Sequence, residues 1–188
     1  MYAQPFQPPS DESDDALMKS VADGNTSAFA ILLRRHQDRV TRVACRLLGG
    51  DVTMAEDVGQ ETFLRVWRTA ATYQPQGTFT AFLLRITRNL CEDTRRRTKG
   101  GDVGLTRETT SPSPDSAVVG SALSEAVRCA VAALPEEQRD VFILSHYENL
   151  TYREIADILN CPMGTVASRK HHAVHALRYA LRDWQEKS

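Results

Sequence analysis

The residues from Leu150 to Arg182 carry a charge pattern that suits nucleic acid. No Asp or Glu lies between Ile158 and Arg182, although the whole chain has a formal net charge of only -1. The basic side chains of this window are Arg169, Lys170, Arg178 and Arg182. Because cations without neighbouring acids attract phosphates and displace their counterions, we expect this segment to approach DNA or RNA.

The same segment has the pattern of a helix-turn-helix. Thr151 and Glu154 form a Thr-x-x-Glu capping box, which begins a helix by satisfying its first backbone donors. Pro162 lies in the tight turn that separates this helix from a longer second one. The second helix would present its outward side chains to a DNA groove, and these are Thr165, Ser168, Arg169, His171 and His172.

A second polar group lies on a helix expected over residues 53–70. We expect a capping box from Thr53 to Glu56 to begin it. Its apolar residues form one stripe, which leaves an opposite surface made of Asp57, Gln60, Glu61 and Leu64. Taken alone, an acidic surface on a helix is usually only solvated.

The loop from Ala71 to Thr78 and the helix expected over residues 79–97 combine aromatic and cationic side chains. Aromatic faces stack on the bases of single-stranded DNA, and cations follow its backbone. We expect Phe79 in the core, whereas the candidates for DNA contact are Tyr73, Phe82, Arg85, Arg88, Asn89, Arg95 and Arg96. The four arginines share one side of the expected helix.

Helices must position all these groups, because no segment has the period of a β-strand. The predicted fold class is all-α, with two small helical domains joined by a flexible linker and the helix-turn-helix in the C-terminal one. The expected divisions are a disordered arm at 1–13, a first domain at 14–98, a linker at 99–121 and a second domain at 122–188.

Composition and motifs exclude several classes of protein. The N-terminal residues lack the features of a signal peptide and no apolar run could span a bilayer, so we expect a cytoplasmic protein. The 4 cysteines are widely spaced and are expected to be buried reduced thiols. His171 and His175 lack a third ligand, so no metal is expected. No cofactor and no small-molecule substrate are expected either. A nucleic-acid enzyme would need a carboxylate cluster or a phosphate-binding glycine loop, and no catalytic residue is assigned.

The run from Ala55 to Trp67, followed by Phe79 to Asn89 and by Gly164, Thr165, Val166, Ser168 and Arg169, resembles the extracytoplasmic-function (ECF) group of bacterial sigma factors. The resemblance spans residues 15–97 and 127–182. In that group the first domain docks on the clamp helices of RNA polymerase and opens the minus-ten element. The second domain binds the polymerase flap and reads the minus-thirty-five element. Departures from the group's pattern are Gly59, Phe82, Ala167, Lys170, Val174 and His175.

The resemblance implies a role for each group of residues. The surface of Asp57, Gln60, Glu61 and Leu64 would bind polymerase, the group from Tyr73 to Arg96 would hold the minus-ten element, and the outward residues of the last helix would contact the minus-thirty-five element. The implied partners are core RNA polymerase, promoter DNA and an anti-sigma factor. The chain would direct promoter-specific initiation without being an enzyme.

An alternative is a helix-turn-helix regulator that acts without being a polymerase subunit, with its N-terminal half as a sensor or dimerisation domain. It explains the basic C-terminal helix but not the surface around Asp57, and a pull-down with core polymerase separates the two interpretations.

Overall fold

A computed structural model of the chain describes residues 12–75, 78–100 and 122–182. Every regular element in these ranges is a helix, which confirms the predicted all-α class. The helices are α1 (Asp14–Ala22), α2 (Thr26–Leu47), α3 (Val52–Thr69), the short 3-10 helix η1 (Ala70–Thr72), α4 (Phe79–Gly100), α5 (Ala122–Ala132), α6 (Glu136–His146), α7 (Tyr152–Leu159) and α8 (Met163–Ala180). The arm predicted at 1–13 and the linker predicted at 99–121 lie outside the described residues, apart from residues 12–13 and 99–100.

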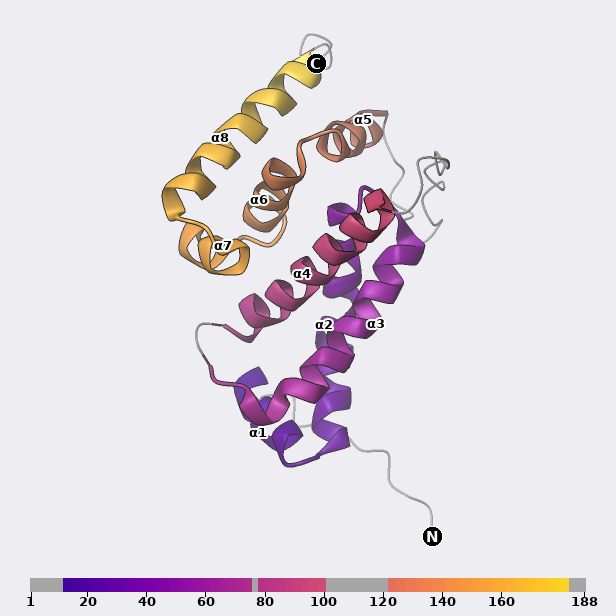
Figure 1. Cartoon of the computed structure of the whole chain (residues 1–188), viewed down its shortest axis with the longest axis vertical. Helices are drawn as coiled ribbons and strands as arrows, with labels where there is room; N and C mark the ends of the chain where they lie inside the picture. Colours follow the sequence, from indigo (N-terminus) through magenta and orange to yellow (C-terminus); the bar gives the residue numbers. More distant parts are fainter. Residues whose placement is uncertain (1–11, 76–77, 101–121, 183–188) are drawn as a thin grey trace.

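The first four helices enclose one core (Figure 1). Helices α2, α3 and α4 pack on one another, and α1 contacts both α2 and η1. Gly59 lies where α3 crosses α2 closely, because a Cβ atom there would be 3.2 Å from the hydroxyl oxygen of Thr41. The fully buried side chains of this core include Leu17, Met18, Leu32, Val40, Val66 and Leu83.

The start of α3 differs from the sequence prediction. The predicted capping box from Thr53 to Glu56 is wrong, since α3 begins at Val52 and its N-cap is Asp51. A carboxylate oxygen of Asp51 accepts a hydrogen bond of 2.9 Å from the backbone nitrogen of Met54. An aspartate directly before the helix is a good cap, and its charge also interacts favourably with the helix dipole.

Helices α6, α7 and α8 form the second core and include the predicted helix-turn-helix. The capping box of α7 is confirmed, because Thr151 and Glu154 each accept from the other's backbone nitrogen, at 3.3 and 2.9 Å. Asn160 ends α7 in the left-handed conformation with φ 49°. Helix α8 packs on this core through Val166, Ala173 and Leu177, which are buried.

The two domains pack against each other (Figure 1). Helix α7 contacts α4, and α6 contacts α2. One cluster of buried apolar side chains draws on both domains, including Leu84 and Cys91 of α4, Val141 of α6 and Ile155 of α7. Sequence analysis predicted two tethered domains but not this contact. None of the helices in the described ranges has both the length and the apolar character needed to cross a membrane.

Candidate nucleic-acid and protein interfaces

The predicted surface on α3, made of Asp57, Gln60, Glu61 and Leu64, is open. Asp57 and Gln60 are exposed, and neither has a hydrogen bond or ion pair among the described residues. Leu64 is 48% exposed beside them. Glu61 is held within its own helix by Arg65, whose Nε lies 3.3 Å from the carboxylate. Free polar groups around an exposed leucine favour a protein contact over simple solvation.

Trp67 extends the apolar part of this α3 surface and was missed by sequence analysis. It lies three residues after Leu64, so it faces the same side of the helix, and it is 36% exposed. The ring of Phe29 packs edge-on against the indole with centroids 5.1 Å apart, which fixes its position. Its spacing from Leu64 was the signal that could have identified it.

The predicted aromatic side chains near the start of α4 form one cluster. Tyr73 and Phe82 are partly buried, with ring centroids 4.8 Å apart, and Phe79 is buried as expected. The hydroxyl of Tyr73 donates to a carboxylate oxygen of Asp15 in α1 at 2.6 Å. Burial, together with this hydrogen bond, raises the pKa of Tyr73, so the phenol remains a protonated donor. Gly77, which sequence analysis placed in the DNA-binding loop, lies outside the described residues.

Two of the arginines predicted to hold DNA are bound by one carboxylate of the other domain. Arg88 donates through Nε to Asp140 of α6 at 3.1 Å, and Arg95 donates through both terminal nitrogens to the two oxygens of Asp140 at 3.0 and 3.2 Å. Burial acts to lower the pKa of Arg95, but the hydrogen bonds and charge of Asp140 outweigh it and raise that pKa. The guanidinium is therefore charged, with both terminal nitrogens bound and its buried Nε without a hydrogen-bond partner among the described residues.

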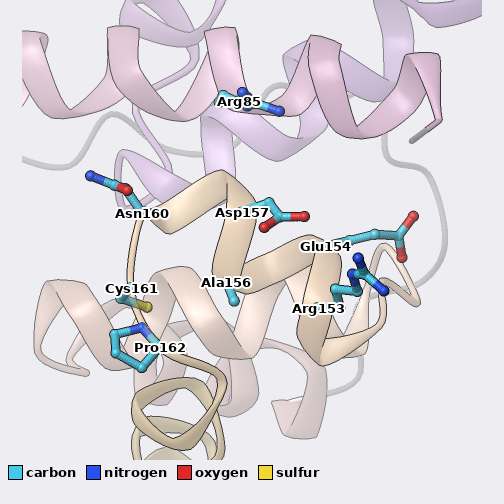
Figure 2. A pocket seen from close by; sticks show the side chains of 8 residues that line it. All are labelled: Arg85, Arg153, Glu154, Ala156, Asp157, Asn160, Cys161 and Pro162. Carbon is cyan, nitrogen blue, oxygen red and sulfur yellow. The ribbon is translucent and has the colours of Figure 1, made fainter. Parts of the chain in front are cut away.

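The other polar residues of this group form no hydrogen bond or ion pair with the second domain among the described residues. Asn89 is exposed, and among the described residues Arg96 pairs with Glu92 and Asp93 of its own helix. Arg85 lines a groove between α4 and α7 and forms no hydrogen bond or ion pair with the described residues. Figure 2 shows Arg85 on α4 across the groove from the α7 side chains, which include Asp157.

The predicted contacts of α8 lie mainly on its outer face. Ser168, His171 and His172 are exposed, and Thr165 is partly buried. Arg169 reaches back to Glu137 of α6, with Nη2 and a carboxylate oxygen 2.5 Å apart. Among the described residues, no group of three or more histidine, cysteine and acidic side chains could hold a metal ion.

Sequence analysis missed the residues that join the two domains. Besides the Asp140 contacts, Arg39 of α2 donates through Nε to Glu148 at 2.6 Å. The guanidinium of Arg46 lies 4.3 Å from the ring centre of Tyr147. A signal for Asp140 existed: it comes four residues before Leu144, so helical spacing places a carboxylate on the buried side of α6.

The cysteines only partly match their predicted burial. Cys91 is fully buried, and burial raises the pKa of its thiol to about 12. Cys45 and Cys161 are partly buried, but Cys129 is exposed, so its prediction was wrong. Helix α5 packs mainly on α8 and leaves this side chain on its outer surface.

Comparison with known proteins agrees with the division into two domains. Residues 32–100 match the family model of Sigma-70 region 2, and residues 124–177 match that of Sigma-70, region 4. The ECF RNA polymerase sigma factor SigW of Bacillus subtilis is 34% identical over 179 residues, which cover 88% of this chain and 95% of SigW. The ECF RNA polymerase sigma factor SigE of Mycolicibacterium smegmatis is 40% identical over 162 residues, covering 83% of this chain and 61% of SigE.

Two solved structures have folds similar to that of this chain. CnrH, determined in complex with the cytosolic domain of CnrY, matches with a TM-score of 0.70 and 25% identity, covering 92% of this chain and 99% of that one. The sigma factor RpoE of Bartonella quintana, in complex with the anti-sigma factor NepR, matches with a TM-score of 0.71 and 25% identity over 82% of this chain and 96% of that one. With both region models matched in order and SigW aligned over nearly its whole length, the protein belongs to the ECF family of RNA polymerase sigma factors.

Proposed function

We propose that this sigma factor binds core RNA polymerase through the α3 surface and contacts promoter DNA through α4 and α8. Its family membership makes it a promoter-specificity factor of transcription initiation and not an enzyme. In this proposal residues 14–98 melt the minus-ten element, residues 122–188 read the minus-thirty-five element, and residues 99–121 link the two.

The open α3 surface is the observation that supports polymerase binding most directly. Asp57 and Gln60 have polar groups without partners in the described part of the chain, and they surround an exposed Leu64. A carboxylate that is free beside an apolar side chain suits an arginine-bearing coiled coil, such as the polymerase clamp. The clamp would cover Leu64 and Trp67 while pairing with the surrounding polar groups.

The minus-ten surface combines the aromatic cluster with the basic side of α4. Tyr73 and Phe82 lie together near the start of α4, and the arginines follow along that helix. Bases leaving the duplex would stack on the aromatic faces, while Arg85, Arg88, Arg95 and Arg96 would hold the strand backbone, with Asn89 as an amide partner.

The minus-thirty-five surface lies on the outer face of α8. Arg169 can donate two hydrogen bonds to a guanine edge or contact a phosphate, and Thr165, Ser168, His171 and His172 flank it. Each DNA contact is weak alone, and polymerase makes the pair strong by fixing their separation. The isolated chain should therefore bind duplex promoter DNA poorly.

We further propose that an anti-sigma factor binds this chain, and that the chain acts in the cytoplasm with its polymerase. The similar structures of CnrH with the cytosolic domain of CnrY and of RpoE with the anti-sigma factor NepR support that kind of partner.

Run-off transcription with core polymerase, followed by start-site mapping, tests the proposed function. The double variant Asp57→Lys, Glu61→Lys should lose binding to core polymerase and start-site-specific transcripts by about tenfold or more, because it places cations against the clamp. The matched control is Asp38→Lys, at an exposed acid of α2 that lies outside the α3 surface. Unchanged start-site selection by the double variant would overturn the proposed α3 contact, and promoter-specific binding without polymerase would favour the regulator instead.

A further inference from the structure

The ion pairs between the two domains are sorted by sign, although Arg139 of α6 also reaches the first domain, where its Nη1 donates to the backbone oxygen of Leu47 at 3.4 Å. The paired cations come from the first domain, and they are Arg39 of α2 and Arg88 and Arg95 of α4. The paired carboxylates come from the second domain, and they are Glu136, Asp140 and Glu148. The second domain therefore presents an acidic surface to the basic side of α4.

Asp140 is the centre of this acidic surface. Its side chain is 1% exposed, whereas the side chains of Arg95 and Arg88 are 9% and 18% exposed. One carboxylate accepts from both arginines, in the paired geometry that guanidinium groups also use to hold phosphate. A carboxylate this deeply buried is stable only with its cations in place.

The covered side of α4 carries two of the arginines assigned to DNA, Arg88 and Arg95. Leu84, Arg88, Cys91 and Arg95 follow one another at spacings of four, three and four residues, so they share one stripe of the helix. Leu84 and Cys91 are fully buried in the cluster that contains side chains of both domains. A DNA strand cannot reach this stripe while α6 and α7 lie on it.

We infer that the second domain inhibits the first from within the chain, because Asp140 occupies Arg88 and Arg95 and keeps promoter DNA from the basic side of α4 until the domains separate. The inference rests on the proposed role of α4 in binding the minus-ten element. The α3 surface stays open in the closed arrangement, so polymerase can bind the closed chain and DNA cannot.

Replacing the central carboxylate tests whether it holds the domains together. Asp140→Asn keeps the shape of the side chain but removes its charge, and Asp38→Asn makes the same change at an exposed acid that contacts neither domain interface nor DNA surface. Opening is measured by the rate at which N-ethylmaleimide alkylates Cys91, with the exposed Cys129 as an internal standard. Asp140→Asn should raise the Cys91 rate roughly tenfold or more, as expected when a buried ion pair loses one partner, while Asp38→Asn leaves it unchanged.

Binding to single-stranded DNA tests whether closure inhibits. The probe is a fluorescent oligonucleotide with the non-template sequence of a promoter mapped by run-off transcription, and the protein is the full chain without polymerase. Asp140→Asn should bind it roughly tenfold more tightly than the unaltered chain, since Arg88 and Arg95 lose the carboxylate that binds them across the interface. Arg39→Gln removes the ion pair with Glu148, which lies outside the residues assigned to DNA. It should raise both the rate of Cys91 alkylation and the affinity for the oligonucleotide, by a smaller factor than Asp140→Asn.

The two readouts and the transcription assay separate the possible failures. An unchanged rate of Cys91 alkylation in folded Asp140→Asn and Arg39→Gln chains would overturn the inference that these ion pairs hold the two domains together. Faster alkylation without tighter DNA binding would overturn its inhibitory role. If the unaltered holoenzyme selects its start site normally in that case, the proposed sigma-factor function stands and only the internal inhibition falls.

Discussion

The two helices assigned to promoter DNA, α4 and α8, are alike in charge and opposite in accessibility. Arg95 of α4 is 9% exposed and bound to a carboxylate of the other domain, whereas Ser168, His171 and His172 of α8 face solvent. Both helices look like open basic surfaces in the sequence. The difference shows that a basic helix face identifies the kind of partner but not whether that partner can reach it.

The acids that oppose each helix explain the contrast. Asp140 is buried against α4 and satisfies two arginines at once. Glu137 meets α8 only at Arg169, and its side chain is 68% exposed. An exposed pair contributes little free energy, about 0.2–1 kcal/mol, so DNA can displace Glu137 far more easily than Asp140.

Removing the α4 arginines should produce the largest effect. The double variant Arg88→Ala, Arg95→Ala leaves Asp140 buried without a cation, so the domains should separate, and it also deletes two proposed contacts to the DNA strand. Run-off transcription by the reconstituted holoenzyme should fall on the order of 100-fold, if each arginine is worth about 1–2 kcal/mol. Alkylation of Cys91 should become faster in the same variant.

Arg96→Ala is the matched comparison on α4, because the described partners of Arg96 lie within its own helix. It should reduce transcription less and leave Cys91 protected. Full transcription by the double variant would contradict the assignment of this helix to DNA and would remove the contrast with α8.

A smaller effect is expected on α8. Arg169→Ala should weaken binding of the holoenzyme to upstream duplex DNA roughly tenfold, because one arginine contact to a base or phosphate is worth about 1–3 kcal/mol. Glu137→Gln should strengthen the same binding by about two- to threefold, since it frees Arg169 from a competing acid. Equal losses in both variants would mean that Glu137 positions Arg169 and does not compete with DNA.

Local patterns predicted the helices and the kind of surface each one carries. The apolar stripe of α3, the capping box of α7 and the turn that contains Pro162 all follow from short-range spacing, and the structure has them. The cap of α3 was misplaced because Thr53 and Glu56 fit the motif, while Asp51 lies closer to the first free backbone donors.

Packing between the domains could not be predicted in the same way. Helical spacing shows that one side of α4 is apolar and another basic, but a basic side bound by Asp140 has the same sequence pattern as one bound by water. The pairing partners lie 45 and 52 residues apart in the chain, so no local motif connects them. Only the position of Asp140 on the buried side of α6 hinted at a distant cation.

Loss of the α7 cap tests how much the helix-turn-helix depends on local structure. Thr151→Ala removes the oxygen that accepts from the backbone nitrogen of Glu154 at 3.3 Å, and should lower the free energy of unfolding by about 1 kcal/mol. Urea unfolding of the full chain, followed by circular dichroism, measures it. Thr151→Ala should weaken binding to upstream DNA. Unlike Asp140→Asn, it should not speed the alkylation of Cys91. Equal opening in both variants would mean that the interface depends on the fold of α7 more than on the charge of Asp140.

The smallest expected effect is a dependence on acid that acts through Glu154 of α7. Hydrogen bonds from the backbone and side chain of Thr151 lower the pKa of Glu154 below its usual 4.5. Because the folded-state pKa is the lower one, the ionised carboxylate stabilises the fold above pH 4.5, and this contribution is lost as the pH falls through the folded-state value. The hydroxyl of Thr78, at the start of α4, also donates to Glu154 at 3.4 Å, so protonation weakens a contact between the domains as well.

Comparing Glu154→Gln with the unaltered chain isolates this charge, because glutamine can still complete the capping box. At pH 7 the free energy of unfolding in urea should be higher for the unaltered chain than for Glu154→Gln. The difference should be smaller than the loss expected for Thr151→Ala. The difference should shrink below pH 4.5, where Glu154 becomes neutral. A difference that stays constant on acidification would show that the charge of Glu154 does not matter.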